Sequence, residues 1–211
     1  MPALYIADGH HRFQTAVTYR DNQRKRFPNA GPQAYDYVLM GFVALEDAGL
    51  EVYPTHRLVE KPEGFSEDAF LAALDPWFEI APASDDLPDA LEDAPGACVI
   101  GLVIEGGGEY LLTLKDIDRA AFLGTDRGPA WRDLDVAVLH RGILEKTLKF
   151  PEGAQFEYEK QAAKAVAAAH NGQAGMAFLL RPTRREQICA CAEASEPMPQ
   201  KSTYFFPKLP S

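Results

Sequence analysis

The residues with the clearest chemical potential lie near the start of the chain, in the segment Leu4-Tyr5-Ile6-Ala7-Asp8-Gly9-His10-His11-Arg12. An apolar stretch stops there, a glycine permits a tight turn, and a helical pattern begins. The first turn of a helix has backbone N–H groups without intrahelical partners and lies at the positive end of the helix dipole, so it attracts anions. His10, His11 and Arg12 add donors, and a guanidinium binds phosphate oxygens in bidentate fashion. This turn is therefore a candidate phosphate site.

Asp8, immediately before the turn, has two interpretations. In the first, its carboxylate caps the helix, Gly9 makes the turn and the neighbouring histidines lie on the surface. In the second, Asp8 or His10 orients or deprotonates a hydroxyl group beside a bound phosphate. A capping carboxylate would occupy the N–H donors that a phosphate needs, so Asp8 cannot serve both purposes unless a metal ion or a proton intervenes. The sequence leaves both interpretations open.

Two further histidines lie in patterns that are compatible with a site. His56 and Arg57 follow Pro54 at a break between apolar stretches, and because proline cannot donate to a central ladder, a functional turn is expected there. The alternative is an ordinary surface turn. His140 shares a helix face with apolar residues, so it is either a ligand of the site or a core histidine whose hydrogen bonds are satisfied.

A second candidate segment, Gln200-Lys201-Ser202-Thr203, lies among aromatic residues and prolines. The ammonium group of Lys201 and the hydroxyl groups of Ser202 and Thr203 are suited to phosphate, while the aromatic rings would pack against a base or the core. No metal-ligand spacing such as H-E-x-x-H is present, so we expect no structural metal site. The glycines at 106–108 are not followed by the Gly-Lys-Ser/Thr of a phosphate loop, and a hairpin explains them.

The elements that must position these residues form a mixed pattern of strands and helices. We expect strands over 3–7, 35–45, 50–59, 77–80, 97–105, 110–115, 156–158 and 176–180, and helices over 11–26, from 66, and over 87–92, 134–148, 161–170 and 183–193. This order predicts an α/β (mixed α+β) protein in which a mixed sheet has flanking helices and the phosphate turn lies at a strand-to-helix junction. The order of the strands within the sheet is not predicted.

Composition excludes several classes of protein. The 211 residues carry 21 basic and 31 acidic side chains, and the net charge of −10 argues against DNA as a partner. Between Glu60 and Asp118 there are 15 acidic and 2 basic residues, which predicts an acidic middle lobe over 60–118. No run approaches the roughly 20 apolar residues of a membrane span, so we expect no membrane partner. Three cysteines and no visible secretory signal predict a cytoplasmic location.

Both ends of the chain have the character of cut ends. Residues 3–7 are apolar directly after the start, and the final residues, STYFFPKLPS, are largely aromatic. A domain normally begins and ends in exposed polar segments. We therefore expect residues 1–211 to be a single domain or the C-terminal half of a longer protein, completed by a missing N-terminal half or by a partner chain.

Five stretches of the sequence resemble a known family. The string YIADGHHRFQTA is similar to the signature of domain-of-unknown-function family 1015, whose members are often labelled ParB-like. The same resemblance extends to DYVLMGFVALED, to the Pro54-Thr55-His56-Arg57 turn with LDVAVLH at 134–140, and to the closing motif MPQKSTYFFPKL. Family members are about twice this length, and the chain resembles their C-terminal half.

The resemblance implies a nucleotide site. The stretch Gly9-His10-His11-Arg12 is similar to the phosphate-binding turns of the ParB and sulfiredoxin superfamily, which implies that Gly9, His11 and Arg12 hold nucleotide phosphates. His10 occupies the position of the sulfiredoxin cysteine, so reduction of a sulfinic acid is not implied. The superfamily includes kinases that phosphorylate free serine with ATP or ADP and proteins that bind CTP. ATP, ADP or CTP with Mg²⁺ is thus the implied cofactor, and Asp8 is a candidate ligand of that ion.

Three hypotheses about function follow. The leading one is a nucleotide-dependent phosphotransferase that acts on a small hydroxylated acceptor, because phosphoryl transfer depends mainly on positioning and charge stabilisation. The second is a non-enzymatic, ParB-like interaction protein whose homodimer or partner contacts change when a nucleotide binds. The third is a family member with no catalysis in this part of the chain. Formation of a phosphorylated product separates the first from the second.

Overall fold

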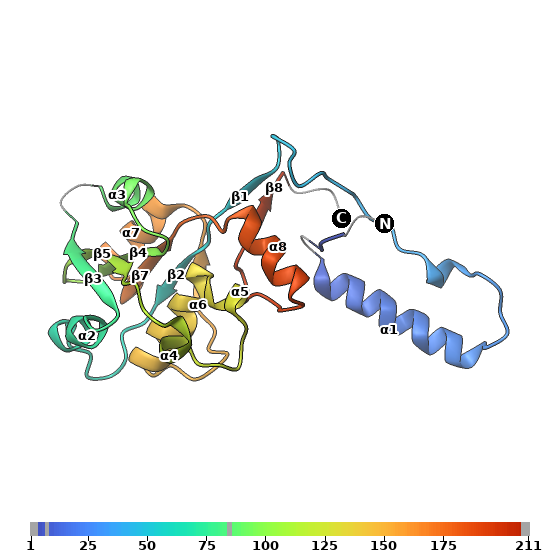
Figure 1. The fold of residues 1–211 in the computed structure, drawn as a ribbon, viewed down its shortest axis with the longest axis horizontal. Coiled ribbons are helices and arrows are strands. Elements are labelled where there is room, and N and C mark those ends of the chain that lie inside the picture. Colours follow the sequence, from blue (N-terminus) through green and yellow to red (C-terminus); the bar gives the residue numbers. More distant parts are fainter. Residues whose placement is uncertain (1–3, 7–8, 84–85, 208–211) are drawn as a thin grey trace. The chain divides into compact units, whose positions relative to one another are not determined.

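A computed structural model of the chain describes residues 4–6, 9–83 and 86–207, which form two compact units. The first unit comprises Met1–Glu51 and Phe205–Ser211, and the second comprises Val52–Tyr204 (Figure 1). Strands β1 (Glu51–Tyr53) and β8 (Tyr204–Phe206) pair in a two-stranded sheet, and the boundary between the units falls within them.

The first unit is built around one helix, α1 (His10–Arg26), followed by a 3₁₀ turn, η1 (Ala34–Asp36). The guanidinium of Arg24 holds the two together, since its Nε and Nη2 donate to the two carboxylate oxygens of Asp36 at 2.9 and 2.5 Å. A hydrogen bond from the backbone N–H of Gln33 and the charge of Arg24 lower the pKa of Asp36. The helix predicted over 11–26 is confirmed, but none of its residues is buried.

Two predicted strands of the first unit are absent from its described residues. Residues 4–6 of the expected strand over 3–7 have no strand pairing, and the rest of that strand lies partly outside the described residues. The prediction over 35–45 is wrong, because Ala34–Asp36 form the 3₁₀ turn and residues 37–44 belong to no helix or strand. Their large apolar side chains are exposed, with Leu39 fully so. An apolar stretch becomes a strand only where a neighbouring strand accepts and donates hydrogen bonds, and none is in place here among the described residues.

The second unit is organised by a six-stranded sheet in the order β3-β5-β4-β7-β2-β6. Every neighbouring pair in this order is antiparallel. The α+β class with flanking helices is therefore confirmed, and the sheet is antiparallel where a mixed one was predicted. The bounds of its strands are β2 (His56–Val59), β3 (Phe78–Pro82), β4 (Val99–Ile104), β5 (Glu109–Leu114), β6 (Glu157–Glu159) and β7 (Met176–Leu180).

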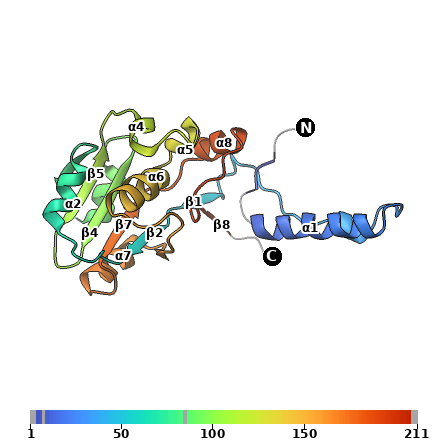
Figure 2. The ribbon, with the colours of Figure 1, turned by 90° about the horizontal axis from the view of Figure 1, so that it is seen from below.

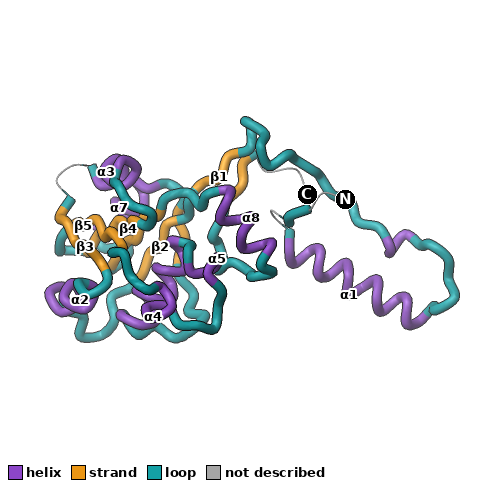
Figure 3. The backbone as a smooth tube through the Cα atoms, viewed as in Figure 1, coloured by secondary structure: helices purple, strands orange, loops and turns teal. Residues whose placement is uncertain are grey.

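Helices cover both faces of this sheet (Figures 2 and 3). Because side chains alternate along a strand, β4 sends Ile100 and Leu102 to one face and Val99 and Val103 to the other. The first face is covered by α2 (Glu67–Leu74), α4 (Arg119–Leu123), α6 (Asp135–Ala137) and the π-helix η2 (Val138–Thr147). The second is covered by α3 (Leu87–Asp93) and α7 (Ala162–His170). The remaining helices of the unit are α5 (Pro129–Arg132) and α8 (Arg185–Glu193).

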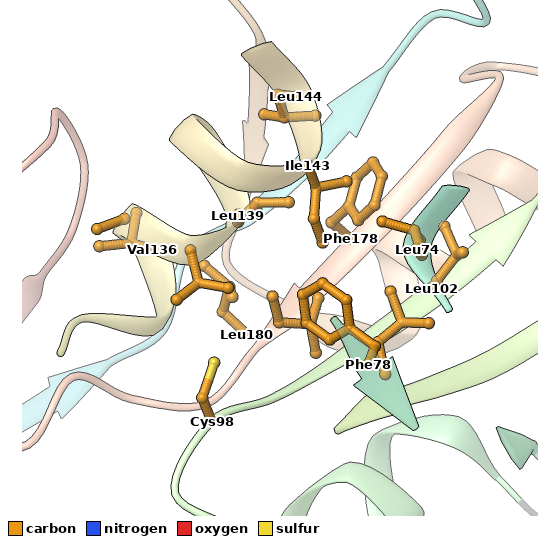
Figure 4. Close-up of a cluster of buried hydrophobic side chains, with 14 of the residues drawn as sticks. Leu74, Phe78, Cys98, Leu102, Val136, Leu139, Ile143, Leu144, Phe178 and Leu180 are labelled. Atoms are coloured by element: carbon orange, nitrogen blue, oxygen red, sulfur yellow. The ribbon is translucent and has the colours of Figure 1, made fainter. Parts of the chain in front are cut away.

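The larger hydrophobic core lies between the sheet and η2. Phe78 and Phe178 project from the strands towards Leu139 and Ile143, and all four side chains are fully buried (Figure 4). The helix predicted over 134–148 is confirmed, and most of its length is wound as a π-helix with i to i+5 hydrogen bonds. Such segments are rare and occur often at functional sites.

No helix among the described residues is long and apolar enough to cross a membrane. The acidic stretch over 60–118 belongs to the second unit and spans α2, α3 and the strands β3 to β5. One of these carboxylates has a structural role, because Glu67 accepts hydrogen bonds from the Tyr110 hydroxyl at 2.6 Å and the Gly108 N–H at 3.0 Å.

Candidate functional site

The turn at the start of α1 depends on the glycine at position 9. Gly9 is the N-cap residue and adopts a left-handed conformation, with φ of 81° and ψ of 20°. Residues with a Cβ atom rarely adopt this conformation, so the turn requires glycine. The first turn of α1 contains no acidic residue, and no side chain caps the helix within the described part of this turn. Asp8, the predicted cap or catalytic group, lies outside the described residues.

Arg12 folds back over this turn. An ideal Cβ atom placed on Gly9 would lie 3.2 Å from Nη2 and 3.4 Å from Nε of Arg12, so the guanidinium covers the helix start. His10, His11 and Arg12 are all exposed. The guanidinium of Arg12 thus lies against Gly9 at the start of α1, and helix starts and guanidinium groups are both known to bind phosphate.

A shallow hollow of about 410 Å³ continues along α1 from this turn. Its lining residues are polar or aromatic, namely His11, Gln14, Thr15, Thr18, Tyr19 and Asn22. The hydroxyl groups of Thr15 and Thr18 donate to the backbone carbonyls of His11 and Gln14, four residues earlier. The side of the hollow nearest the turn is therefore formed by His11.

Arg57, the second candidate, is the most buried charged residue among those that the structure describes, with 0% of its surface exposed. Its Nε donates to Nε2 of His140 at 3.1 Å, and its Nη2 donates to the carbonyls of Gln200 at 3.1 Å and Lys201 at 3.0 Å. Its Nη1 donates to the carbonyl of Thr55. Burial lowers the pKa of Arg57 to about 10, so it stays protonated at neutral pH.

These partners of Arg57 are all uncharged. The ring of Tyr158, on the neighbouring strand β6, lies 5.2 Å from the guanidinium carbon and faces the cation. A buried charge is tolerated only where hydrogen bonds replace its hydration. Arg57 therefore has its donors engaged by the protein, in contrast to the exposed Arg12.

Two histidines of the second unit, His56 and His140, are held neutral by their surroundings. His56 is buried and its Nδ1 accepts a hydrogen bond from the N–H of Leu180 at 3.2 Å. Burial, followed by the charge of Arg57, lowers the pKa of both His56 and His140 to about 4. Since Nε2 of His140 accepts from Arg57, the proton of the neutral ring is assigned to Nδ1.

The segment from Pro199 to Thr203 has a tightly held backbone. Lys201 has a left-handed φ of 55°, which is unusual for a residue with a side chain. The Ser202 hydroxyl donates to the Pro199 carbonyl at 2.5 Å, and the Ser202 carbonyl accepts from the Thr183 hydroxyl at 2.8 Å. Ser202 is buried, whereas the side chain of Lys201 is exposed and that of Thr203 is half-buried.

The second unit thus brings together residues that lie far apart in the sequence. Arg57 and His140 are in contact, and both belong to the same cluster as the backbone of Gln200 and Lys201. Tyr158 and Thr183 were not among the residues predicted from the sequence. The pairing of β2 with β6, which places Tyr158 opposite Arg57, carries no sequence signal that could have indicated the first of them.

No group of three or more histidine, cysteine or carboxylate side chains suited to a metal ion occurs in the described ranges. Two of the cysteines are also poorly suited to chemistry as thiolates. Burial raises the pKa of Cys98 well above its ordinary value and that of Cys191 to about 11. Both thiols are therefore protonated at neutral pH.

The fold is that of an α+β protein whose antiparallel six-stranded sheet is covered by helices on both faces. Residues 1–137 match the family model described as "Protein of unknown function (DUF1015)". The chain belongs to this family. No curated protein sequence matches the chain.

Several solved structures are similar to the chain. A conserved hypothetical protein from Pyrococcus furiosus has 14% sequence identity and a TM-score of 0.50, with 97% of this chain and 71% of that chain covered. A free serine kinase in complex with AMP has 13% identity and a TM-score of 0.47, with 95% of this chain and 66% of that chain covered. A mutant of a free serine kinase in complex with ADP has 14% identity and a TM-score of 0.46 over the same shares.

Proposed function

We propose that this protein binds a nucleotide through the turn at the start of α1 and acts as a phosphotransferase on a small hydroxylated molecule. The observation that carries the proposal is the geometry of Gly9 and Arg12. A left-handed glycine opens the helix, and the guanidinium of Arg12 lies over that glycine, beside the backbone donors of the first turn. A phosphate group at this position would receive hydrogen bonds from both.

The residues of the turn have separate roles in this proposal. Gly9 gives the phosphate access to the backbone, and His11 and Arg12 donate hydrogen bonds to its oxygens. Asp8 or His10 orients or deprotonates the acceptor hydroxyl, as phosphoryl transfer requires. Mg²⁺ would arrive with the nucleotide and would supply charge neutralisation of its phosphates, and Asp8 is the residue proposed to hold it. The similarity of this turn to those of the ParB and sulfiredoxin superfamily supports the same assignment.

Further donors are proposed in the second unit. Within the second unit, taken by itself and apart from the turn of α1, the exposed ammonium of Lys201 and the hydroxyl of Thr203 are candidates for a phosphate contact. For Ser202 we propose a role of the backbone only, because its hydroxyl is buried and donates to the Pro199 carbonyl. His56 and His140 are assigned to the framework around Arg57, where both rings are buried for the most part and neutral.

A nucleotide-gated interaction protein is the second candidate function. The extended segment at 37–43 favours it, since Tyr37, Leu39 and Phe42 are 73%, 100% and 69% exposed. Exposed apolar patches of this kind commonly mark interaction sites. In this alternative the same turn binds the nucleotide, and the bound state changes the assembly of the protein without forming a phosphorylated product.

Calorimetric titration with ATP, ADP and CTP, with and without Mg²⁺, tests the nucleotide site. We expect binding by the natural chain and a loss of at least about tenfold in affinity for Arg12→Ala, because a charge-assisted contact is removed. The matched control is Arg20→Ala, which removes an exposed arginine from the same helix that pairs with the adjacent Asp21. Equal losses in the two variants, or no binding by the natural chain, would overturn the assignment.

Product analysis then separates the two functions. A phosphotransferase converts a hydroxylated acceptor into its phosphate ester in the presence of the nucleotide, which mass spectrometry of an acceptor screen detects. An interaction protein forms no ester, and its sedimentation coefficient changes on addition of the nucleotide.

A further inference from the structure

A hollow of about 300 Å³ lies where α2, α4 and the end of η2 meet in the second unit. Small side chains line it from two of these helices, Ala73 from α2 and Ala121 from α4. Because alanine ends at Cβ, both positions leave space that a longer side chain would fill. All of the lining residues belong to the second unit, so the hollow is independent of the turn before α1.

The apolar part of the lining is a pair of stacked aromatic rings. The ring centroids of Trp77 and Phe122 are 4.6 Å apart, with an interplanar angle of 22°. The ring of Phe122 is tightly packed, since a Cβ atom on Gly142 would lie only 2.4 Å from its Cζ atom. Trp77 is only partly buried, which leaves some of its surface accessible. A flat, rigid ring suits such a surface, because it buries apolar area at little cost in conformational entropy.

The polar part of the lining carries two positive charges. Lys146 and Lys149 both line the hollow, and none of the lining residues is acidic. Nζ of Lys146 donates to the Phe122 carbonyl at 2.6 Å, which leaves two of its three N–H donors for another acceptor. The neighbouring carboxylate of Glu145 is paired with Arg141 at 3.2 Å. The hollow is thus a local positive site in a chain whose net charge is −10.

Lys149 occupies a position at which glycine is the usual residue. It follows the C-cap of η2 with a left-handed φ of 64°, and helices that end in this conformation most often have glycine there. Side chains held in this conformation cluster at functional sites. A cation near a helix C-terminus also stabilises the helix, so a test of this residue must measure binding.

We propose that this hollow binds a small aromatic anion. The ring of the ligand packs against Trp77 and Phe122. Its carboxylate or phosphate group accepts hydrogen bonds from the ammonium groups of Lys146 and Lys149. The volume is at the lower end of the range for small-molecule pockets, roughly 300–1,000 Å³, which selects a ligand of one or two rings. This proposal does not rest on the nucleotide site, and either can fail without the other.

An NMR titration with benzoate and with phenyl phosphate tests the site. The chain has two tryptophans, and Trp131, which does not line the hollow, provides an internal reference for the indole N–H signal of Trp77. We expect a saturable shift of the Trp77 signal alone, with a Kd of about 1 mM for ligands of this size. The anion that binds more tightly identifies the preferred charged group.

Benzyl alcohol separates the contribution of the charge from that of the ring. It has the same ring and no anionic group, so we expect it to bind about tenfold more weakly than benzoate. Equal binding of benzyl alcohol, or no saturation with either anion, would overturn the proposal.

Two lysine variants test the charged part of the hollow. Lys149→Gly is well suited, because glycine tolerates the φ of 64° and the change removes only the side chain. We expect Lys149→Gly and Lys146→Met each to weaken benzoate binding about fivefold. The matched control is Lys164→Met, an exposed lysine of α7, which covers the other face of the sheet and should leave the affinity unchanged. Unchanged affinity in both test variants would show that the lysines do not bind the anion.

A variant that fills the hollow tests the remaining part of the proposal. Ala121→Leu keeps both lysines but occupies the space beside the aromatic rings, so we expect it to weaken benzoate binding by about tenfold or more. Ala163→Leu is its control, because Ala163 is an exposed alanine of α7. If Ala121→Leu binds benzoate as the natural chain does, the anion binds the lysines at the open surface and the assignment of the hollow is wrong.

Discussion

The dipeptide His-Arg occurs at positions 11–12, 56–57 and 140–141, and the first two copies, in which both residues are candidates, have opposite surroundings in the structure. His11 and Arg12 are exposed in the first turn of α1, a helix with no buried residue. His56 and Arg57 begin the strand β2, where both are buried under the sheet's flanking layers. The first pair has donors available to a ligand, whereas the donors of the second pair are bound to the protein.

This difference shows that the role of each arginine depends on whether its hydrogen-bond donors are already bound by the protein. Both guanidinium groups carry the same charge and the same hydrogen-bonding pattern, but Arg57 has exchanged its hydration for carbonyl groups and a histidine ring. A buried and fully engaged cation can hold a backbone in place. An exposed cation beside a helix start can bind an anion.

Replacing each arginine should therefore affect stability very differently. We expect Arg57→Met to lower the free energy of unfolding of the second unit by about 3 kcal/mol, because several buried acceptors lose their donor. Arg12→Ala should change it by less than about 0.5 kcal/mol, as is usual for an exposed site. Urea unfolding followed by tryptophan fluorescence measures this, since Trp77 and Trp131 both lie in the second unit.

A similar loss of unfolding free energy in Arg12→Ala and Arg57→Met would contradict the expected difference between the exposed and the buried arginine. Phe178→Ala supplies a reference for the largest effect, because it removes a fully buried ring from the core of the same unit. Substitutions of this kind typically cost about 3–5 kcal/mol. We expect the loss of unfolding free energy for Arg57→Met to approach that for Phe178→Ala. The unfolding free energy of Arg12→Ala should be close to that of the natural chain.

The buried histidine of the second pair should make the unit sensitive to acid. The pKa of His56 is about 4 in the folded state and 6.5 in the reference state, so the unfolded chain binds the extra proton between these values. Stability is then fully present above pH 6.5 and is lost as the pH falls towards 4. By linkage the loss is at most about 3 kcal/mol for this residue, and urea midpoints measured from pH 8 to pH 4 should show it.

The buried carboxyl group of Asp135 has the opposite effect on stability at acidic pH and therefore provides a control. Burial raises the pKa of Asp135 to about 6 from 3.8, with Arg181 acting in the other direction, so the folded state holds a proton between those values. Its stabilising contribution is present below pH 3.8 and is lost as the pH rises through 6. Asp135→Asn should therefore remove this opposition and make the acid loss steeper, while His56→Gln should make it shallower.

The smallest expected effect concerns the backbone of Lys201. Glycine tolerates a φ of 55°, so Lys201→Gly should leave the free energy of unfolding within about 0.5 kcal/mol of its natural value. Lys164→Gly is the matched control, because Lys164 is an exposed lysine inside α7, where glycine costs about 1 kcal/mol. A larger loss for Lys201→Gly than for Lys164→Gly would mean that the Lys201 side chain, and not its backbone, supports the turn.

Local patterns predicted most of the second unit. The strand at 176–180 and the hairpin around residues 106–108 occur as expected, because short continuous apolar runs and glycines at the turn act over short distances. The helix over 161–170 is confirmed within one residue at its start. The π-winding of η2 was not predicted; within it, the ring of Phe122 occupies the place that a Cβ atom on Gly142 would take.

The candidate site was predicted less completely. The importance of Gly9 follows from the sequence, because a glycine before a helix allows the left-handed turn that is observed. The same reasoning grouped Lys201, Ser202 and Thr203 as equivalent donors, although the hydroxyl of Ser202 is directed to a carbonyl. It also left open whether His140 is a ligand or a core residue, and its contact with Arg57 and Phe156 places it in the framework.

By itself the sequence determined most helices, most strands and the glycine turn before α1, because these depend on neighbours within a few residues. Only the tertiary structure decided that Arg57 would be buried and bound to carbonyls 143 and 144 residues away. It also decided that the apolar segment at 37–43 would stay unpaired among the described residues. Burial and strand pairing join distant parts of the chain, and a local sequence pattern does not indicate which of these parts will pair or pack together.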